Sequence, residues 1–171
     1  MNTFVTFLAL LGVKHTKSFS GQYFNEHPHK DNLYGLSEML SGYRIPNAAT
    51  HIDDKENDLS RIDLPFIAHA GGDFVAVYNV ESDKVHYLWN GKKIAVPVSQ
   101  FISIWSGVVL LAEITANSCE PDYKAHRKKD LFTIAQQSIL TLACFLLLGI
   151  ACITSTLGRA DVNCTPKFGR N

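Results

Sequence analysis

A long run without charged residues lies near the C-terminal end of the chain and limits how the chain can fold. It extends from Leu131 to Leu157, broken only by Gln136, Gln137 and a few Ser and Thr residues. A helix needs roughly 20 apolar residues to cross the hydrocarbon core of a membrane. The alternative is a buried core helix, but a domain this small could not enclose a helix that is apolar on all sides. The sequence therefore predicts a single transmembrane helix over residues 130–157.

The remainder of the chain divides around this helix. We expect a folded domain over residues 1–115, a basic linker over residues 116–129 and a short tail over residues 158–171. The linker's basic residues favour a cytoplasmic position for the domain that precedes the helix. The first apolar run, near Phe4, has no Lys or Arg before it, which argues against a signal peptide. These patterns predict a single-pass protein of the cytoplasmic membrane, with its N-terminal domain inside.

Strand signals dominate the stretch from Leu64 to Glu113. The run Phe74–Val80 is rich in β-branched and aromatic residues, and Lys84–Trp89 alternates in the manner of a strand. Asn90-Gly91 follows, the dipeptide that favours a type I′ hairpin turn. The sequence predicts an antiparallel sheet, and its further expected elements are a return strand over Lys93–Pro97, a short helix capped by Ser99 and a last strand over Val108–Ala112.

Helical signals precede the strands. Apolar residues recur at helical spacing over Thr3–Leu11, and His27-Pro28 is expected to end a second helix that is capped by Thr16 or Ser18. Asn32 can cap a third helix over Leu33–Leu40. A short strand is expected over residues 48–52, an acidic loop over 53–58 and a helical turn over 58–62. Helices followed by strands are typical of an α+β domain.

Charge and cysteine content exclude several classes of function. The chain has 16 Lys and Arg against 16 Asp and Glu, so no net field attracts nucleic acid. The four cysteines are Cys119, Cys144, Cys152 and Cys164, all beyond the predicted domain and none in a CxxC pair. This spacing offers neither a zinc ribbon nor a thioredoxin motif, and it excludes a disulfide framework for the domain. We expect no cofactor and no nucleic-acid partner.

The middle of the chain resembles the bacteriocin-processing cysteine peptidases, which cut leader peptides after a double glycine and stand at the N-termini of ABC exporters. The resemblance extends from Leu33 to Glu113 and implies a papain-like fold, a cytoplasmic position and a membrane segment after the domain. Four motifs carry it: LxGLSxxLxxYxI at Leu33–Ile45, LPFIAH at Leu64–His69, DFVAVYxV at Asp73–Val80 and FxxxWSGVVLL at Phe101–Leu111.

The same resemblance implies catalytic residues that this chain lacks. Such a peptidase uses a Cys thiolate at a helix N-terminus, a His that activates it and an Asp or Asn that orients the imidazole. No Cys occurs before Cys119, the place of the family's His holds Asp73, and the place of its Asp falls near Asn90. The sequence therefore predicts a non-catalytic relative, whose vestigial cleft is expected near His69, Asp73, Phe74 and Asn90.

Two alternatives from the residues themselves remain. Ser18 or Ser20 with His69 and Asp73 would be a substitute catalytic set, although no GxSxG motif marks either serine. The pair His27 and His29 suggests a metal site, but the pair has no third ligand in register.

A second resemblance concerns the kind of partner. Peptidase-like domains without the nucleophile are also fused to membrane oxidoreductases similar to vitamin K epoxide reductase. The segments VKHTKSF and EHPHKDNLYGLSEML are similar to that group, but this chain has neither the several spans nor the CxxC of the oxidoreductase. The expected function is binding of a peptide, a leader-peptide segment, or a membrane exporter or oxidoreductase partner. An active double-glycine leader peptidase that uses unrecognised residues is the alternative.

Overall fold

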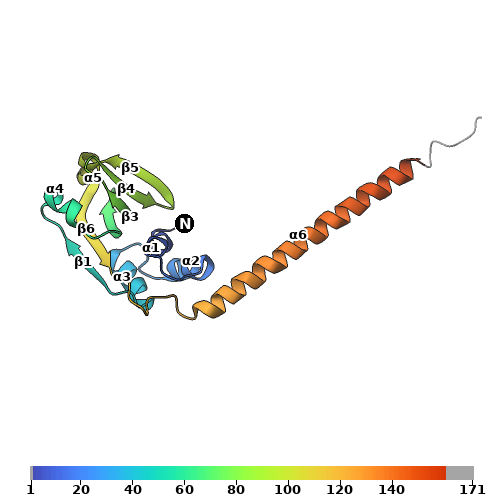
Figure 1. Ribbon diagram of the computed structural model, residues 1–171, viewed down its shortest axis with the longest axis horizontal. Coiled ribbons are helices and arrows are strands. Elements are labelled where there is room, and N and C mark those ends of the chain that lie inside the picture. The colour runs from blue at the N-terminus through green and yellow to red at the C-terminus, as the bar shows by residue number, and fades with distance from the viewer. Residues whose placement is uncertain (1, 161–171) are drawn as a thin grey trace, which may run out of the picture. The chain divides into compact units, whose positions relative to one another are not determined.

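The computed structural model describes residues 2–160, and for residues 151–160 we describe the backbone alone. The chain forms two compact units that divide between Arg127 and Lys128. Figure 1 shows helices and a curved sheet in the first unit and one long helix in the second. The elements are, in chain order, α1 (Thr3–Leu10), α2 (Lys17–Glu26), α3 (Leu33–Gly42), β1 (Asn47–His51), α4 (Lys55–Asp58), η1 (Leu59–Arg61), β2 (Phe66–Ala70), β3 (Asp73–Val80), β4 (Lys84–Trp89), β5 (Lys92–Pro97), α5 (Val98–Ile104), β6 (Trp105–Ala112) and α6 (Tyr123–Ala160).

The strands form one antiparallel sheet in the order β1-β6-β2-β3-β4-β5. The β4–β5 hairpin turns at Asn90 and Gly91, whose φ values of 49° and 78° are those of the predicted type I′ geometry. Helices α1, α2 and α3 lie together beside the sheet (Figure 1), and residues of α1 and α3 share a buried core with Ile67, Ala76 and Leu110 of the strands. The α+β prediction is confirmed.

A second buried core lies on the other face of the sheet. It joins Phe66, Val77 and Val109 of the strands to Phe101 of α5 and Leu59 of η1. The alternation predicted for β4 is confirmed, because Val85 and Tyr87 belong to this core. The domain therefore places one face of its sheet against the N-terminal helices and closes the other face with α5 and η1.

Several expected element boundaries were wrong. Helix α5 begins one residue before Ser99, and Pro97 rather than Ser99 holds the cap position, without a side-chain capping bond. The acidic segment expected as a loop contains the single turn α4, capped by Asp54. The last strand begins at Trp105, so that Gly107, at φ 91°, lies within the strand rather than before it.

By its length and composition, helix α6 could cross a membrane over Tyr123–Ile150. Its large apolar side chains are exposed from Leu131 to Ile150, the part of the helix whose side chains are described, and this suits a lipid-facing helix. The helix begins earlier than the apolar run, so the basic cluster that includes Lys124 and Arg127 is part of its first turns and not of an extended linker. The predicted tail lies outside the described residues from position 161 onward.

Candidate functional site

A cleft of about 290 Å³ lies where α1 and the loop before α3 meet the β2–β3 turn and the β4–β5 turn. It contains three of the four residues that the sequence resemblance singles out: Asp73, Phe74 and Asn90. Its complete lining is Asn2, Thr3, Phe24, Lys30, Asp31, Leu36, Gly72, Asp73, Phe74 and Asn90. None of these described residues is a Cys, a His or a Ser.

The N-terminus of α1 forms one wall of the cleft. The side chain of Asn2 accepts a hydrogen bond of 2.8 Å from the Val5 N–H and caps the helix. Thr3 Oγ1 donates a hydrogen bond of 2.8 Å to the carbonyl oxygen of Phe74, which joins the helix to β3. A helix N-terminus stabilises negative charge and lowers the pKa of a thiol placed there. The residues at this helix N-terminus are Asn2 and Thr3, and neither provides a thiol.

Asp73 stands at the opposite wall. Its Oδ1 accepts a hydrogen bond of 2.7 Å from the Phe74 N–H, and its Oδ2 accepts one of 2.6 Å from Trp89 Nε1. An ionised carboxylate only accepts hydrogen bonds, whereas an imidazole also donates and can relay a proton near neutral pH. Asp73 thus gives the cleft a fixed negative charge at the place where the family resemblance expects a proton-transferring His.

His69 lies beside this cleft rather than in its lining. It pairs directly with Phe74 across β2 and β3, so both side chains share one face of the sheet. Its ring centroid is 5.1 Å from that of Phe74, and its Nδ1 is 3.1 Å from the Oγ of Ser106. The predicted cleft residues are therefore neighbours, but His69 contacts Ser106 and Phe74 rather than Ser18 or Ser20.

The serines of the substitute catalytic set, Ser18 and Ser20, lie outside the lining of the cleft. Ser20 is fully buried, its Oγ donates to the Glu120 carboxylate at 3.3 Å, and it accepts from the Tyr43 hydroxyl at 2.9 Å. A buried hydroxyl with two committed partners is not open to a peptide substrate. Ser18 is exposed on α2. Neither serine lines the cleft that contains Asp73.

A buried carboxylate, Glu120, lies in the segment that the sequence predicts as a linker, and no sequence pattern marks it. Glu120 is 1% exposed and accepts hydrogen bonds from the Thr16 N–H at 2.5 Å and the Thr16 hydroxyl at 2.9 Å. Its Oε1 is also 2.8 Å from His126 Nδ1, and the His126 ring stacks on Phe19 with centroids 4.0 Å apart. Burial, together with the Glu120 charge, raises the pKa of Tyr43 against the opposing effect of its bond to Ser20. We call Glu120, Thr16, Ser20 and His126 the clasp, because they join the segment before α6 and the first turn of α6 to the start of α2.

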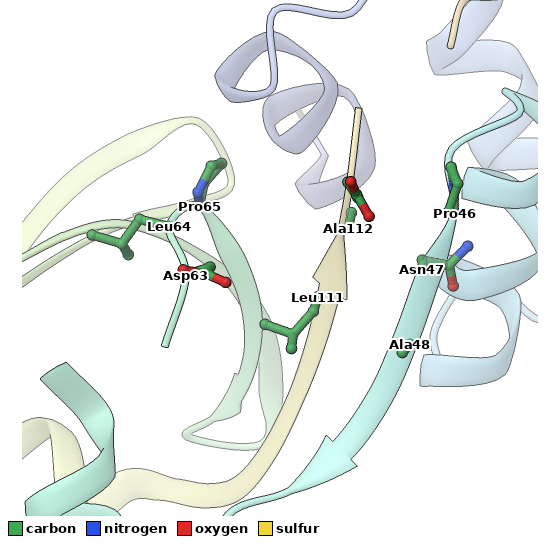
Figure 2. A pocket seen from close by; sticks show the side chains of 9 residues that line it. Pro46, Asn47, Ala48, Asp63, Leu64, Pro65, Leu111 and Ala112 are labelled. Atoms are coloured by element: carbon green, nitrogen blue, oxygen red, sulfur yellow. The ribbon is translucent and has the colours of Figure 1, made fainter. Parts of the chain in front are cut away.

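A larger hollow than the cleft lies elsewhere. It has a volume of about 510 Å³ and lies at the far end of β2 from the cleft, between Leu64 and Pro65 on one side and Leu111 and Ala48 on the other (Figure 2). The only charged side chains in its lining are Asp63 and Glu113, and the rest is mostly apolar. Its lining contains none of His69, Asp73, Phe74 and Asn90, so its size does not make it the candidate site.

His27 and His29, which follow the end of α2, are the metal ligands that the sequence suggests. His27 Nε2 lies 3.5 Å from the Glu38 carboxylate, and the ring centroids of His27 and His29 are 6.3 Å apart. Within residues 2–160 no group of three or more His, Cys, Asp or Glu side chains is placed to hold a metal ion.

Comparison with known proteins agrees with this geometry. The sequence model of the peptidase C39 family matches residues 27–117, which is more than half of the chain. The chain belongs to the peptidase C39 family. No curated protein matches its sequence.

Solved structures of similar fold include a protease and peptidase or peptidase-like domains. One is a double-glycine motif protease from an AMS/PCAT transporter, solved in complex with the leader peptide. It has a TM-score of 0.57 and 15% identity, over 66% of this chain and 81% of that one. The peptidase domain of Streptococcus ComA, a bifunctional ABC transporter, has a TM-score of 0.55 and 13% identity, over 66% of this chain and 88% of that one. The N-terminal peptidase C39-like domain of a toxin secretion ATP-binding protein from Vibrio parahaemolyticus has a TM-score of 0.51 and 13% identity, over 67% of this chain and 98% of that one. At these identities the likeness establishes the papain-like fold alone.

Proposed function

We propose that this protein is a membrane-anchored C39-type domain that binds a peptide or a partner protein in its cleft without cutting it. The observation that carries the proposal is the lining of that cleft. A helix N-terminus, a strand end and a hairpin turn meet as the family's chemistry requires, yet the side chains there are Thr3, Asp73 and Asn90. Without a thiolate and an imidazole, the nucleophilic step of a cysteine peptidase has no reacting groups.

The fold retains what binding needs. The cleft is open to solvent, with an aromatic side chain from Phe74 and a fixed negative charge from Asp73. An extended segment also gains main-chain hydrogen bonds when it adds to a sheet edge, independently of catalytic residues. Asp73 replaces a side chain that can carry positive charge, so the cleft favours a basic or neutral segment over an acidic one.

The proposed setting is the cytoplasmic face of a membrane, next to an exporter or a membrane redox protein. Two observations support it: the basic residues at the start of α6, and the relatives that belong to ABC transporters. A second candidate function, leader peptidase activity through Ser18 or Ser20 with His69, has less support because Ser20 is buried and His69 contacts Ser106.

Charge reversal in the cleft tests the binding proposal. The full chain in lipid nanodiscs is titrated with a fluorescently labelled double-glycine leader peptide, and anisotropy gives the affinity. Binding energy is concentrated in a few anchor residues, so Asp73→Lys should weaken binding by about tenfold. Asp83→Lys, the same reversal at an exposed position of the β3–β4 turn, is the matched control and should leave binding unchanged. Equal affinities for wild type and Asp73→Lys would place any binding elsewhere, with the transmembrane helix as the next surface to examine.

A further inference from the structure

A second, smaller hollow lies on the other side of Asp73 from the cleft. Its volume is about 170 Å³, and it is formed where the β2–β3 turn, the end of β4 and the end of α5 meet. The turn is held there by a hydrogen bond of 2.9 Å from the Gly71 N–H to the Ile104 carbonyl oxygen. The residues that line it are Ala70, Gly71, Asp73, Val75, Tyr87, Trp89 and Ile104.

Two exposed apolar side chains stand in this lining. Trp89 is 43% exposed and Ile104 is 40% exposed, whereas Tyr87 beside them is 8% exposed. Trp89 is not free to rotate away, because its indole N–H donates a hydrogen bond of 2.6 Å to Asp73 Oδ2. Tryptophan is enriched among the residues that contribute most to binding at interfaces. The hollow thus combines a preformed aromatic wall with open access.

The hollow has a single charge. Among its described lining residues only Asp73 has a carboxylate or a basic group, and its neighbours are aliphatic or aromatic. Lys92 pairs with Trp89 across the β4–β5 turn but is not part of the lining. A carboxylate offers about four lone-pair sites, and the hydrogen bonds from Phe74 and Trp89 occupy two of them. Asp73 therefore keeps acceptor capacity toward a bound group.

These features specify the chemistry of an occupant. Its stem must be apolar, to lie against Val75 and Ile104, and its end must donate hydrogen bonds and carry positive charge, to meet Asp73. A cation is also attracted to the face of an indole ring, by an amount that grows when water is excluded. The volume is below the roughly 300–1,000 Å³ of a site for a whole small molecule, and it suits one long side chain.

We infer that this hollow holds an arginine or lysine side chain of the segment that binds in the cleft. Because Asp73 lines both the cleft and the hollow, one peptide can lie in the first and place a side chain in the second. The inference rests on the proposed binding function and adds the specificity that the cleft alone does not define: a basic residue with an aliphatic stem. Arginine is preferred over lysine, because its planar guanidinium can stack on the Trp89 ring and donate to Asp73 together.

Tryptophan emission provides the measurement. The chain has two tryptophans, and Trp105 is 1% exposed, so a response to added peptide comes from Trp89. The full chain in nanodiscs is titrated with three blocked tripeptides, Ala-X-Ala, in which X is arginine, citrulline or norleucine. Citrulline keeps the shape of arginine without its charge, and norleucine keeps only the apolar stem. The arginine peptide should shift the emission and bind about tenfold more tightly than the other two.

Three variants support the assignment. Asp73→Asn keeps an acceptor for the Trp89 N–H but removes the charge, and should abolish the preference for arginine over citrulline. Trp89→Phe should remove the signal, and Asp83→Asn, in the neighbouring turn, should behave as wild type. Equal binding of the three peptides, tighter binding of norleucine, or no response to any peptide would each overturn the inference.

The outcome also distinguishes this inference from the proposed binding function on which it rests. A leader peptide whose binding is lost in Asp73→Lys, yet is unaffected when its arginines and lysines are replaced by citrulline and norleucine, leaves the cleft function in place and refutes the cation site. Failure of the leader peptide to bind, with a clear arginine preference among the tripeptides, would refute the cleft function while keeping a cation-binding hollow.

Discussion

Glu120 lies in a polar segment of the sequence, yet its carboxylate is buried. A buried carboxylate is stable only when its oxygens are paired, and the clasp supplies donors from Thr16, Ser20 and His126. Thr16 holds the cap position of α2, but its side chain serves Glu120 and makes no capping bond. The sequence therefore predicts the position of Thr16 at the start of the helix correctly, but the hydrogen-bond partner of its side chain is Glu120 and not the helix backbone.

Glu120→Gln tests the clasp. The amide NH2 would face N–H and O–H donors in place of one carboxylate oxygen, so we expect a loss of about 1–3 kcal/mol in the free energy of unfolding. Glu56→Gln, an exposed carboxylate on α4, should change stability by no more than about 0.5 kcal/mol. Urea unfolding of the full chain in detergent, followed by circular dichroism, compares the two. Equal stability of both variants would mean that the buried network contributes little.

Tyr43 gives the clasp a pH signature. Its raised pKa means that the folded state holds the phenolic proton more tightly than the unfolded state. This contribution to stability is complete below the ordinary tyrosine pKa of about 10, and it decreases as pH rises above that value. Tyr43→Phe should therefore lose less thermal stability than wild type between pH 9 and pH 11. A melting temperature that falls equally in both proteins over this range would contradict the assignment.

At the scale of elements, the sequence predicted the turns and helix caps that depend on contacts between residues close together in the chain. Asn90-Gly91 identified the hairpin, and Asn32 identified the start of α3, where its side chain caps the Gly35 N–H at 2.8 Å. Contacts between distant parts of the chain were not predictable in this way. Thr16 and Glu120 are 104 positions apart, and Thr3 and Phe74 are 71 apart, so no spacing rule connects them. Asp73 and Asn90 were assigned to the cleft through the family resemblance, whereas the α1 wall of the cleft was found from the structure.

Two glycines in helices provide a matched test of packing against propensity. A Cβ on Gly35 of α3 would collide with the carbonyl group of His29, whereas a Cβ on Gly21 of α2 would meet nothing within 4 Å. Gly35→Ala should destabilise the protein by about 1–3 kcal/mol, because backbone must move. Gly21→Ala should stabilise it by about 0.5–1 kcal/mol, the gain in helix propensity. Chemical unfolding measures both, and the same sign for the two substitutions would refute the placement of α3 against the preceding loop.

At the scale of the whole molecule, the question is which side of the membrane the domain occupies. The basic residues in the first turns of α6 predict that the domain lies in the cytoplasm and that residues from Gly158 onward lie outside. A reporter enzyme that is active only outside the cytoplasm should therefore be active when fused after Asn171. Activity of the same reporter when fused before Met1 would reverse the topology and remove the domain from cytoplasmic peptides.

Whether the domain binds without cutting is tested most directly by the fate of a bound peptide. Immobilised full chain in nanodiscs is incubated with a double-glycine precursor peptide, and mass spectrometry identifies what is retained and what is released. Because no described residue that lines the cleft is a Cys or a His, we predict that wild type retains the intact precursor and that Asp73→Lys retains about tenfold less. Fragments that end in the double glycine, formed by wild type and absent with Ser18→Ala or His69→Ala, would contradict the account and establish a peptidase.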